Sequence, residues 1–207
     1  GALEAGIKRF VFSSSAKIYG SLEDYPSKED AIPNPETPYA LTKMVGENFC
    51  RMFSEKYDME IICLRYFSVY GPYQNLHYGY VGPIVDALCN GRVPVLPGDE
   101  TLERDFTYID DVVSAVFGAL ITSNIKFGIF NVGAGKASSL KEVIYFVNRF
   151  TSKNIEPIYQ PLLKGMARKT LADLSQAREV LGYKPSVGLE QGLKELVIWY
   201  LSSRVIV

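Results

Sequence analysis

Histidine is nearly absent from this sequence, which contains only His77 among its 207 residues. A hydrolytic Ser-His-Asp triad therefore has one candidate base, and a metal site built from several histidines is excluded. His77 stands among Tyr73, Tyr78 and Tyr80, so we interpret it as a loop or pocket-rim residue. We expect no metal site.

Cysteine is also scarce. The three cysteines, Cys50, Cys63 and Cys89, are far apart and stand in apolar surroundings. This spacing favours buried thiols over a disulfide framework or a zinc site, which need cysteines in more regular patterns. Buried thiols are typical of a reducing compartment, so we expect a cytoplasmic protein.

Neither a charge excess nor a long hydrophobic run is present. The sequence has 22 Lys and Arg against 23 Asp and Glu, and this balance gives no electrostatic basis for binding nucleic acid or an anionic membrane. No apolar run approaches the roughly 20 residues of a transmembrane helix. We therefore expect neither nucleic acid nor a membrane as a partner.

A glycine-rich phosphate loop is missing as well, although the sequence contains 17 glycines. No Gly-x-x-Gly-x-x-Gly segment is found, and such a segment brings the backbone close to the pyrophosphate of a dinucleotide. Residues 133–135 (Gly-Ala-Gly) predict only a short turn, because no Lys-Ser or Lys-Thr pair follows them.

What is present is an alternation of strands and helices. Short apolar runs predict buried strands at residues 9–12, 60–65 and 127–132. Thr37 and Pro38 predict the start of a helix, and residues 139–142 (SLKE) predict a capping box at another. The fold class is therefore α/β with a mostly parallel sheet.

Tyr39 and Lys43 lie four positions apart on a predicted helix, downstream of a strand that ends in Ser13, Ser14 and Ser15. Free tyrosine has a pKa of about 10, and a cation one helical turn away favours the phenolate. Tyr39 is therefore suited to act as a general acid or base, and Ser15 can hydrogen-bond the reacting oxygen. Such pairs also occur by chance on exposed helices, but the serine strand end and the Pro-capped helix favour a catalytic group.

Further motifs extend this pattern along the chain. They are residues 11–20 (VFSSSAKIYG), the Tyr39 and Lys43 pair, and residues 64–72 (LRYFSVYGP), 104–112 (RDFTYIDDV), 130–133 and 172–175. Together they resemble the extended short-chain dehydrogenase/reductase family, in particular its nucleotide-sugar epimerases. The resemblance implies NAD as the cofactor. It also implies the C-terminal half of a Rossmann-like parallel sheet domain plus a small α/β substrate-binding domain.

The resemblance assigns roles to individual residues. Tyr39 would be the catalytic base, Lys43 its electrostatic partner and a ligand of the ribose, and Ser15 the hydroxyl at the reacting sugar oxygen. The residues implied to bind the cofactor are Ser13, Ser14, Tyr39, Lys43 and Tyr66. The residues implied to contact the substrate, a nucleotide sugar and first of all a UDP-sugar, are Ser15, Ser68, Arg104 and Arg168.

The substrate residues differ in how well they match the family. Arg104 suits a diphosphate because the planar fork of arginine matches phosphate oxygens, although a salt bridge with Glu103 or Asp105 is the alternative. Ser68 stands where the family usually has asparagine, and its side chain is shorter. Arg168 follows a segment that departs from the family's Arg-Pro-Gly-Asp pattern.

The residues after Ser15 bear on the reaction type. Related dehydratases and decarboxylases carry an acidic residue there; in the dehydratases, expelling water requires an additional acid and base. This sequence has Ala16 and Lys17 instead, which favours epimerisation at sugar C4, of the UDP-glucose 4-epimerase type. The alternatives are a dehydratase or reductase of the same family, and a non-catalytic nucleotide-sugar-binding remnant without its own NAD site.

The resemblance begins near the fourth helix of the family fold, so we expect a fragment of a longer protein or a truncated relative. Residues 1–75 would form part of the NAD-binding and catalytic domain, with residues 105–130 returning to it. Residues 76–104 and 131–207 would mainly bind the nucleotide sugar. The helix that carries Tyr39 is the expected contact of a homodimer.

Overall fold

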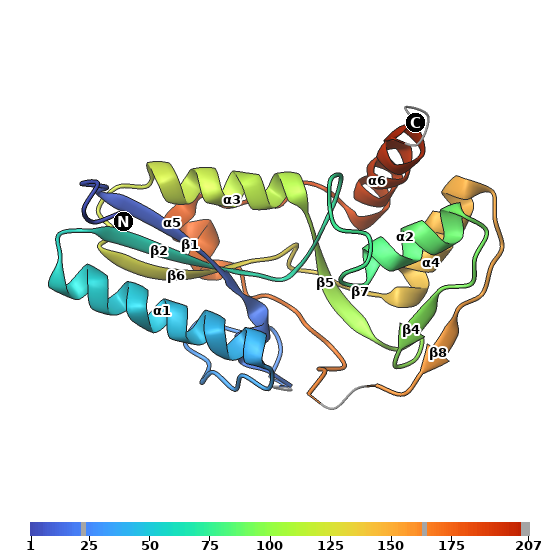
Figure 1. Cartoon of the computed structure of the whole chain (residues 1–207), viewed down its shortest axis with the longest axis horizontal. Helices are drawn as coiled ribbons and strands as arrows, with labels where there is room; N and C mark the ends of the chain where they lie inside the picture. Colours follow the sequence, from blue (N-terminus) through green and yellow to red (C-terminus); the bar gives the residue numbers. More distant parts are fainter. Residues whose placement is uncertain (22–23, 163–164, 204–207) are drawn as a thin grey trace.

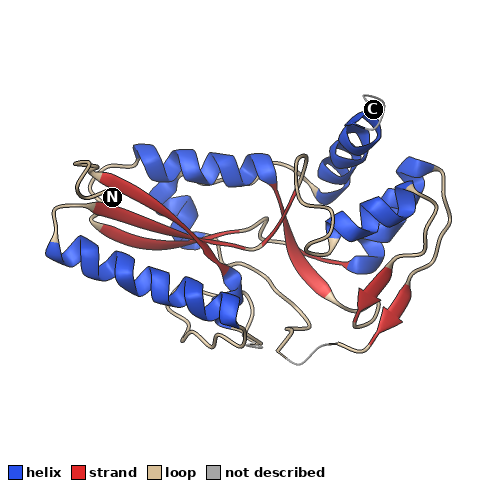
Figure 2. Cartoon of the chain, viewed as in Figure 1, coloured by secondary structure: helices blue, strands red, loops and turns tan. Residues whose placement is uncertain are grey.

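The computed structural model describes residues 1–21, 24–162 and 165–203 (Figure 1). In chain order its elements are β1 (Arg9–Ser15), the 3-10 helix η1 (Ala16–Tyr19), α1 (Pro38–Lys56), β2 (Glu60–Tyr66), β3 (Ser68–Tyr70), α2 (Val81–Cys89), β4 (Val95–Pro97), β5 (Glu103–Tyr108), α3 (Ile109–Ile121), β6 (Phe127–Val132), β7 (Ala137–Ser139), α4 (Leu140–Thr151), β8 (Ile158–Gln160), α5 (Ser175–Leu181) and α6 (Leu189–Ser203). Strands and helices alternate along much of the chain (Figure 2), and the predicted α/β class is confirmed.

The first group of elements is built on a parallel sheet in the order β1-β2-β6. Its central strand β2 is buried along most of its length, because α1 covers one face and α3 covers the other (Figure 1). The register aligns Ser15 of β1 with Tyr66 of β2, and Tyr66 with Val132 of β6. The carboxyl ends of these strands therefore meet at one edge, where ligands bind in open α/β sheets.

The second group is mainly helical. Helices α2, α4 and α6 pack around a core that includes Leu88, Leu140 and Leu196, and β4 and β8 form a small parallel pair. Strand β5 pairs in parallel with β3 and antiparallel with β7. The β5–β7 pair is thus the exception to the predicted, mostly parallel pairing. Helix α5 packs on α3 and β6 of the first group. No helix in the described ranges is both long and apolar enough to cross a membrane.

Helix α1 begins where the sequence predicts. The Thr37 hydroxyl accepts a hydrogen bond from a backbone N–H of the first turn at 3.2 Å, and Pro38 stands where a missing N–H costs no helical bond. The helix then packs closely on β1, since a Cβ at Gly46 would lie 2.4 Å from the Phe12 ring. This contact holds the amino-terminal half of α1, with Tyr39, against the strand end.

A buried polar cluster joins α1 to the sheet. The Arg65 guanidinium donates to both carboxylate oxygens of Glu47 at 2.8 and 3.0 Å, and the two side chains are 3% and 5% exposed. Arg65 also donates to the Tyr19 hydroxyl at 2.9 Å, and Tyr19 donates to Asn131 at 2.7 Å. Burial raises the pKa of Tyr19 to about 12, so this phenol stays protonated. The cluster ties α1, η1, β2 and β6 together beneath the strand ends.

Candidate active site

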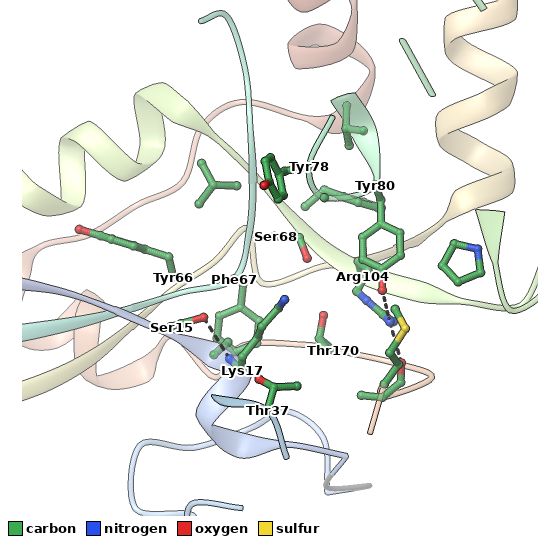
Figure 3. A pocket seen from close by; sticks show the side chains of 18 of the residues that line it. Ser15, Lys17, Thr37, Tyr66, Phe67, Ser68, Tyr78, Tyr80, Arg104 and Thr170 are labelled. Carbon is green, nitrogen blue, oxygen red and sulfur yellow. Dashed lines mark hydrogen bonds between the residues drawn. The ribbon is translucent and has the colours of Figure 1, made fainter. Parts of the chain in front are cut away.

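A cavity of about 480 Å³ opens at the carboxyl end of the first sheet (Figure 3). Both groups of elements contribute to it. Its lining includes four of the residues predicted to contact cofactor or substrate, namely Ser15, Tyr66, Ser68 and Arg104. The volume falls within the range of about 300 to 1,000 Å³ that is usual for small-molecule sites.

Tyr39 stands in the first turn of α1, beside the cavity and outside its lining. The residue is 49% exposed. Two ammonium nitrogens lie near its ring: Lys43 Nζ is 5.6 Å and Lys17 Nζ is 5.5 Å from the ring centroid. A tyrosine that handles protons as a base needs cationic neighbours of this kind.

Hydrogen bonds to β1 position the groups around Tyr39. Lys43 Nζ donates to the backbone carbonyl of Ser13 at 2.9 Å. Ser15 Oγ accepts from the backbone N–H of Lys17 at 3.2 Å. The structure thus gathers Ser15, Tyr39 and Lys43 at one strand end. Lys17 also lies beside Tyr39, a position that the sequence does not predict. The short η1 turn that carries Lys17 has no strong sequence signal.

Ser13 and Tyr66 meet across the ends of β1 and β2. Ser13 Oγ and the phenolic oxygen of Tyr66 are 3.4 Å apart, and either can be the donor. Burial raises the pKa of the Tyr66 phenol, against the opposing effect of the Ser13 hydrogen bond. Tyr66 is therefore a neutral ring at the edge of the cavity.

Ser14 lies on the opposite side of β1 from its two serine neighbours, because successive side chains of a strand alternate. Its hydroxyl donates to Glu47 within the buried cluster, and the residue is 2% exposed. The structure therefore does not bring Ser14 to the cavity with the other predicted cofactor residues. The two-residue period of the strand is the signal that separates it from them.

Arg104 is a buried cation at the cavity. Its guanidinium donates to the Tyr80 hydroxyl at 2.8 Å, and to the backbone carbonyls of Glu103, Ala167 and Arg168 at 2.6, 2.6 and 3.1 Å. All four partners are uncharged groups. In the part of the chain that the structure describes, Arg104 forms no ion pair. The charge of a buried guanidinium with only neutral partners is not compensated by a carboxylate, so it suits an anionic ligand.

The two carboxylates that flank this arginine in sequence are engaged elsewhere. Glu103 pairs with Lys169 at 2.8 Å. Asp105 accepts hydrogen bonds from the backbone N–H groups of residues 134–135 at 2.6 and 3.0 Å and of Ala172 at 3.1 Å. Burial raises the pKa of Asp105 to about 6, although these hydrogen bonds lower it. Neither carboxylate neutralises the arginine.

Arg168 points away from the cavity. Its guanidinium pairs with Asp99 at 2.5 Å, and its side chain is 61% exposed. Only its backbone carbonyl reaches the site, where it accepts from Arg104. The structure thus separates this side chain from the other predicted substrate residues. Leu163 and Lys164 of the same segment lie outside the described residues.

Gln74 is a cavity residue that sequence reasoning did not single out. Its amide Nε2 is buried and lacks a hydrogen-bond partner among the described residues. Buried polar groups are nearly always paired, so Gln74 presents a donor that a ligand can satisfy. A single glutamine in a loop gives no sequence signal for this role. Across the described ranges, no three His, Cys, Asp or Glu residues are grouped so as to hold a metal ion.

Comparison with known proteins gives a consistent likeness. The model of the NAD dependent epimerase/dehydratase family matches residues 1–133. The chain is 34% identical over 196 residues to a putative UDP-glucose 4-epimerase of Methanocaldococcus jannaschii, which covers 93% of this chain and 63% of the relative. It is also 34% identical over 201 residues to a UDP-glucose 4-epimerase of Mycolicibacterium smegmatis, and this alignment covers 95% of this chain and 63% of the relative. The chain therefore spans 63% of the length of both curated relatives.

Solved structures share the fold. A UDP-glucose 4-epimerase from Thermotoga maritima with UDP-glucose superposes with a TM-score of 0.92 at 32% identity, covering 98% of this chain and 66% of that one. A UDP-glucuronic acid 4-epimerase from Bacillus cereus in complex with UDP-glucuronic acid and NAD superposes with a TM-score of 0.88 at 29% identity. The superposition covers 94% of this chain and 62% of that one. The family model matches more than half of the residues of this chain, so the chain belongs to the NAD dependent epimerase/dehydratase family.

Proposed function

We propose that this chain supplies the proton-transfer residues and the nucleotide-sugar site of an NAD-dependent UDP-sugar 4-epimerase. The observation that carries the proposal is that Ser15, Tyr39 and Lys43 converge at the end of β1, beside a cavity that Ser15 and the buried Arg104 line. The first three can handle a hydroxyl proton, and the arginine matches a diphosphate. A nucleotide sugar presents both groups in one molecule.

The residues at the strand ends fit the nicotinamide and its ribose. Lys43 Nζ is held at the Ser13 carbonyl, so its remaining protons are available to ribose hydroxyls, and Tyr66 borders the same edge. The sequence holds no glycine-rich loop for the pyrophosphate, so the fit extends to this half of the dinucleotide. NAD held there would supply the acceptor, and then the donor, of the hydride at sugar C4.

Tyr39, Ser15 and Lys43 move the proton. The Tyr39 phenolate oxygen takes the proton of the sugar 4-hydroxyl as the C4–H bond breaks and a carbonyl forms at C4. The Ser15 hydroxyl hydrogen-bonds that oxygen, and the Lys43 ammonium stabilises the charge on Tyr39. After the sugar turns its other face to these groups, Tyr39 returns the proton and the configuration at C4 is inverted.

The remaining predicted residues receive narrower roles. Arg104 binds the diphosphate, and Ser68 contacts the sugar from the start of β3. Arg168 acts through its carbonyl, which holds the Arg104 guanidinium. Ser14 acts through Glu47 and the buried cluster rather than on the cofactor.

Ala16 and Lys17 support epimerisation over dehydration, because no carboxylic acid follows Ser15 to expel water. A second candidate is a nucleotide-sugar-binding protein without its own NAD site. It predicts UDP-sugar binding without turnover.

We divide the roles between the two groups of elements. Residues 1–75 with 105–130 would hold the cofactor and the catalytic residues, and residues 76–104 and 131–207 would mainly hold the nucleotide. The free thiols of Cys50 and Cys63 support a reducing, cytoplasmic setting.

A homodimer through α1 is the proposed assembly. This helix exposes a run of large apolar side chains, namely Leu41, Val45, Phe49, Met52 and Phe53. A contiguous apolar surface of this kind marks a protein contact. Analytical ultracentrifugation should give a dimer for the wild type and a monomer for Phe49→Asp, and a wild-type monomer would contradict the assembly.

Binding and turnover together test the proposal. Calorimetry would measure UDP-glucose and, in parallel, NAD binding, and chromatography would measure UDP-galactose formed from UDP-glucose and NAD. Tyr39→Phe should bind UDP-glucose as the wild type does but lose turnover by about 100-fold or more. Tyr145→Phe, which changes an exposed tyrosine on α4, is the matched control. Turnover that survives in Tyr39→Phe, or failure to bind UDP-glucose, would contradict the proposal; binding without wild-type turnover would favour the second candidate.

A further inference from the structure

The function proposed above assigns one cation at the cavity, Lys17, to no group of the ligand. Among the described residues, the lining contains two cations, Lys17 and Arg104, and one carboxylate, Glu36. Arg104 serves the diphosphate in the function proposed above. The Glu36 carboxylate accepts a hydrogen bond from Ser21 at 2.8 Å. Lys17 forms no ion pair within the described ranges, so its ammonium is available to a ligand.

Lys17 is placed close to the reacting atoms. It extends into the cavity from η1, directly after the strand end (Figure 3). Its backbone N–H is fixed by Ser15 Oγ at 3.2 Å, and its ammonium nitrogen lies 5.5 Å from the Tyr39 ring centroid. A ligand group held by Lys17 therefore lies next to the hydroxyl that Tyr39 deprotonates.

The chemistry of a hexose limits what that group can be. When the 4-hydroxyl meets Tyr39, the adjacent ring carbons are C3 and C5. C5 carries C6, the carbon that is a carboxylate in the hexuronic acids. An ammonium group has three donors and no acceptor, whereas a carboxylate accepts only, so the two are complementary. A neutral 6-hydroxyl would form the weaker, singly charged hydrogen bond.

Gln74 adds an independent reason to expect an acceptor-rich ligand. Its Nε2 is buried without a partner among the described residues, and it lines the same cavity as Lys17. An unpaired buried donor costs free energy that a ligand oxygen would recover. The charge of Lys17 favours an anionic sugar over a neutral one, and Gln74 offers a further donor to the sugar oxygens.

We propose that Lys17 selects UDP-sugars that carry a carboxylate at C6, so that the substrate class is the UDP-hexuronic acids. This assignment rests on the proposed function, because it takes the 4-hydroxyl to lie at Tyr39. Lys17 would then hold the carboxylate through a charge-assisted hydrogen bond while Arg104 holds the diphosphate at the other end of the ligand.

Calorimetric titration separates the role of Lys17 from that of the nucleotide site. The ligands are UDP, UDP-glucose and UDP-glucuronic acid, and the proteins are the wild type, Lys17→Met, Lys17→Arg and Lys184→Met. Lys184 is exposed and outside the cavity lining, so its substitution removes the same charge without changing the site. The affinity for UDP measures whether the nucleotide site is intact. The ratio of the affinities for UDP-glucuronic acid and UDP-glucose measures the contribution of Lys17.

The wild type and Lys184→Met should bind UDP-glucuronic acid about tenfold more tightly than UDP-glucose. Lys17→Met should lose this preference with UDP affinity unchanged, and Lys17→Arg should keep most of it. Equal affinities in the wild type, or a preference that survives in Lys17→Met, would overturn the assignment while UDP binding leaves the proposed function standing. Failure of UDP itself to bind would overturn the proposed function and this assignment with it.

Discussion

The Glu47→Ala variant should lose about 3–5 kcal/mol of unfolding free energy, because it leaves the Arg65 guanidinium buried without its counter-ion. The two side chains are 5% and 3% exposed, and the carboxylate accepts two hydrogen bonds from Arg65 at 2.8 and 3.0 Å. Ser14 loses its acceptor at the same time, which adds about 1 kcal/mol. The loss should exceed that of an ordinary surface substitution several-fold.

Urea unfolding followed by far-ultraviolet circular dichroism measures this loss. Fluorescence is less suitable, because the single tryptophan, Trp199, lies on α6 in the other group of elements. Glu55→Ala is the matched control, since it removes an exposed carboxylate from the same helix. That control should change the unfolding free energy by no more than about 0.5 kcal/mol.

The double variant Glu47→Leu with Arg65→Met distinguishes a charge effect from a packing effect. Replacing a whole buried ion pair by apolar side chains is often close to neutral, so the double variant should be more stable than Glu47→Ala. A loss of less than about 1 kcal/mol in Glu47→Ala would refute the reasoning. So would a double variant that is less stable than Glu47→Ala, because the cost would then arise from packing.

Two other predictions follow from buried groups. Gly192→Ala should lose about 1–3 kcal/mol in the same urea assay, because its Cβ would lie 2.3 Å from the Tyr70 hydroxyl oxygen in the packed core; wild-type stability would contradict this close approach. Burial raises the pKa of Asp105 to about 6, above its unfolded value, so the folded state holds the proton more tightly and the stability from this group is lost as the pH rises from about 4 to about 6. Between about pH 3 and about pH 7 the wild type should therefore lose about 3 kcal/mol more than Asp105→Asn, at 1.36 kcal/mol per pKa unit. Stability curves of the two proteins that stay parallel over this range would exclude the effect.

The fold could be predicted from local patterns, because they record local physics. Apolar runs indicated the strands, and Thr37 with Pro38 indicated the start of α1 because the capping groups are adjacent in the chain. The position of Ser15 at the cavity follows from its place at the carboxyl end of β1, whereas the role of Arg104, the second residue of β5, was inferred from the family resemblance.

The rest depended on contacts between distant segments. The Arg168 side chain is held by Asp99, a residue 69 positions away, and no local pattern records that pairing. The exposure of Lys17 to the cavity follows from the η1 turn and the packing of α1. The unpaired amide of Gln74 belongs to the loop between β3 and α2, which lines the cavity only in the folded chain. Ser14 is different, since strand alternation alone would have separated it from Ser13 and Ser15.

Calorimetric titration of UDP into the wild type, Arg104→Met and Arg168→Met tests most directly whether the cavity is the nucleotide-sugar site. A charged hydrogen bond contributes about 1.5–3 kcal/mol, so Arg104→Met should weaken UDP binding by about 10- to 150-fold. Arg168→Met removes an arginine from the adjoining exposed surface and should change the affinity by about twofold at most. Thermal unfolding of each variant checks that it is folded. Unchanged UDP affinity in folded Arg104→Met, or a large loss in Arg168→Met alone, would contradict the account.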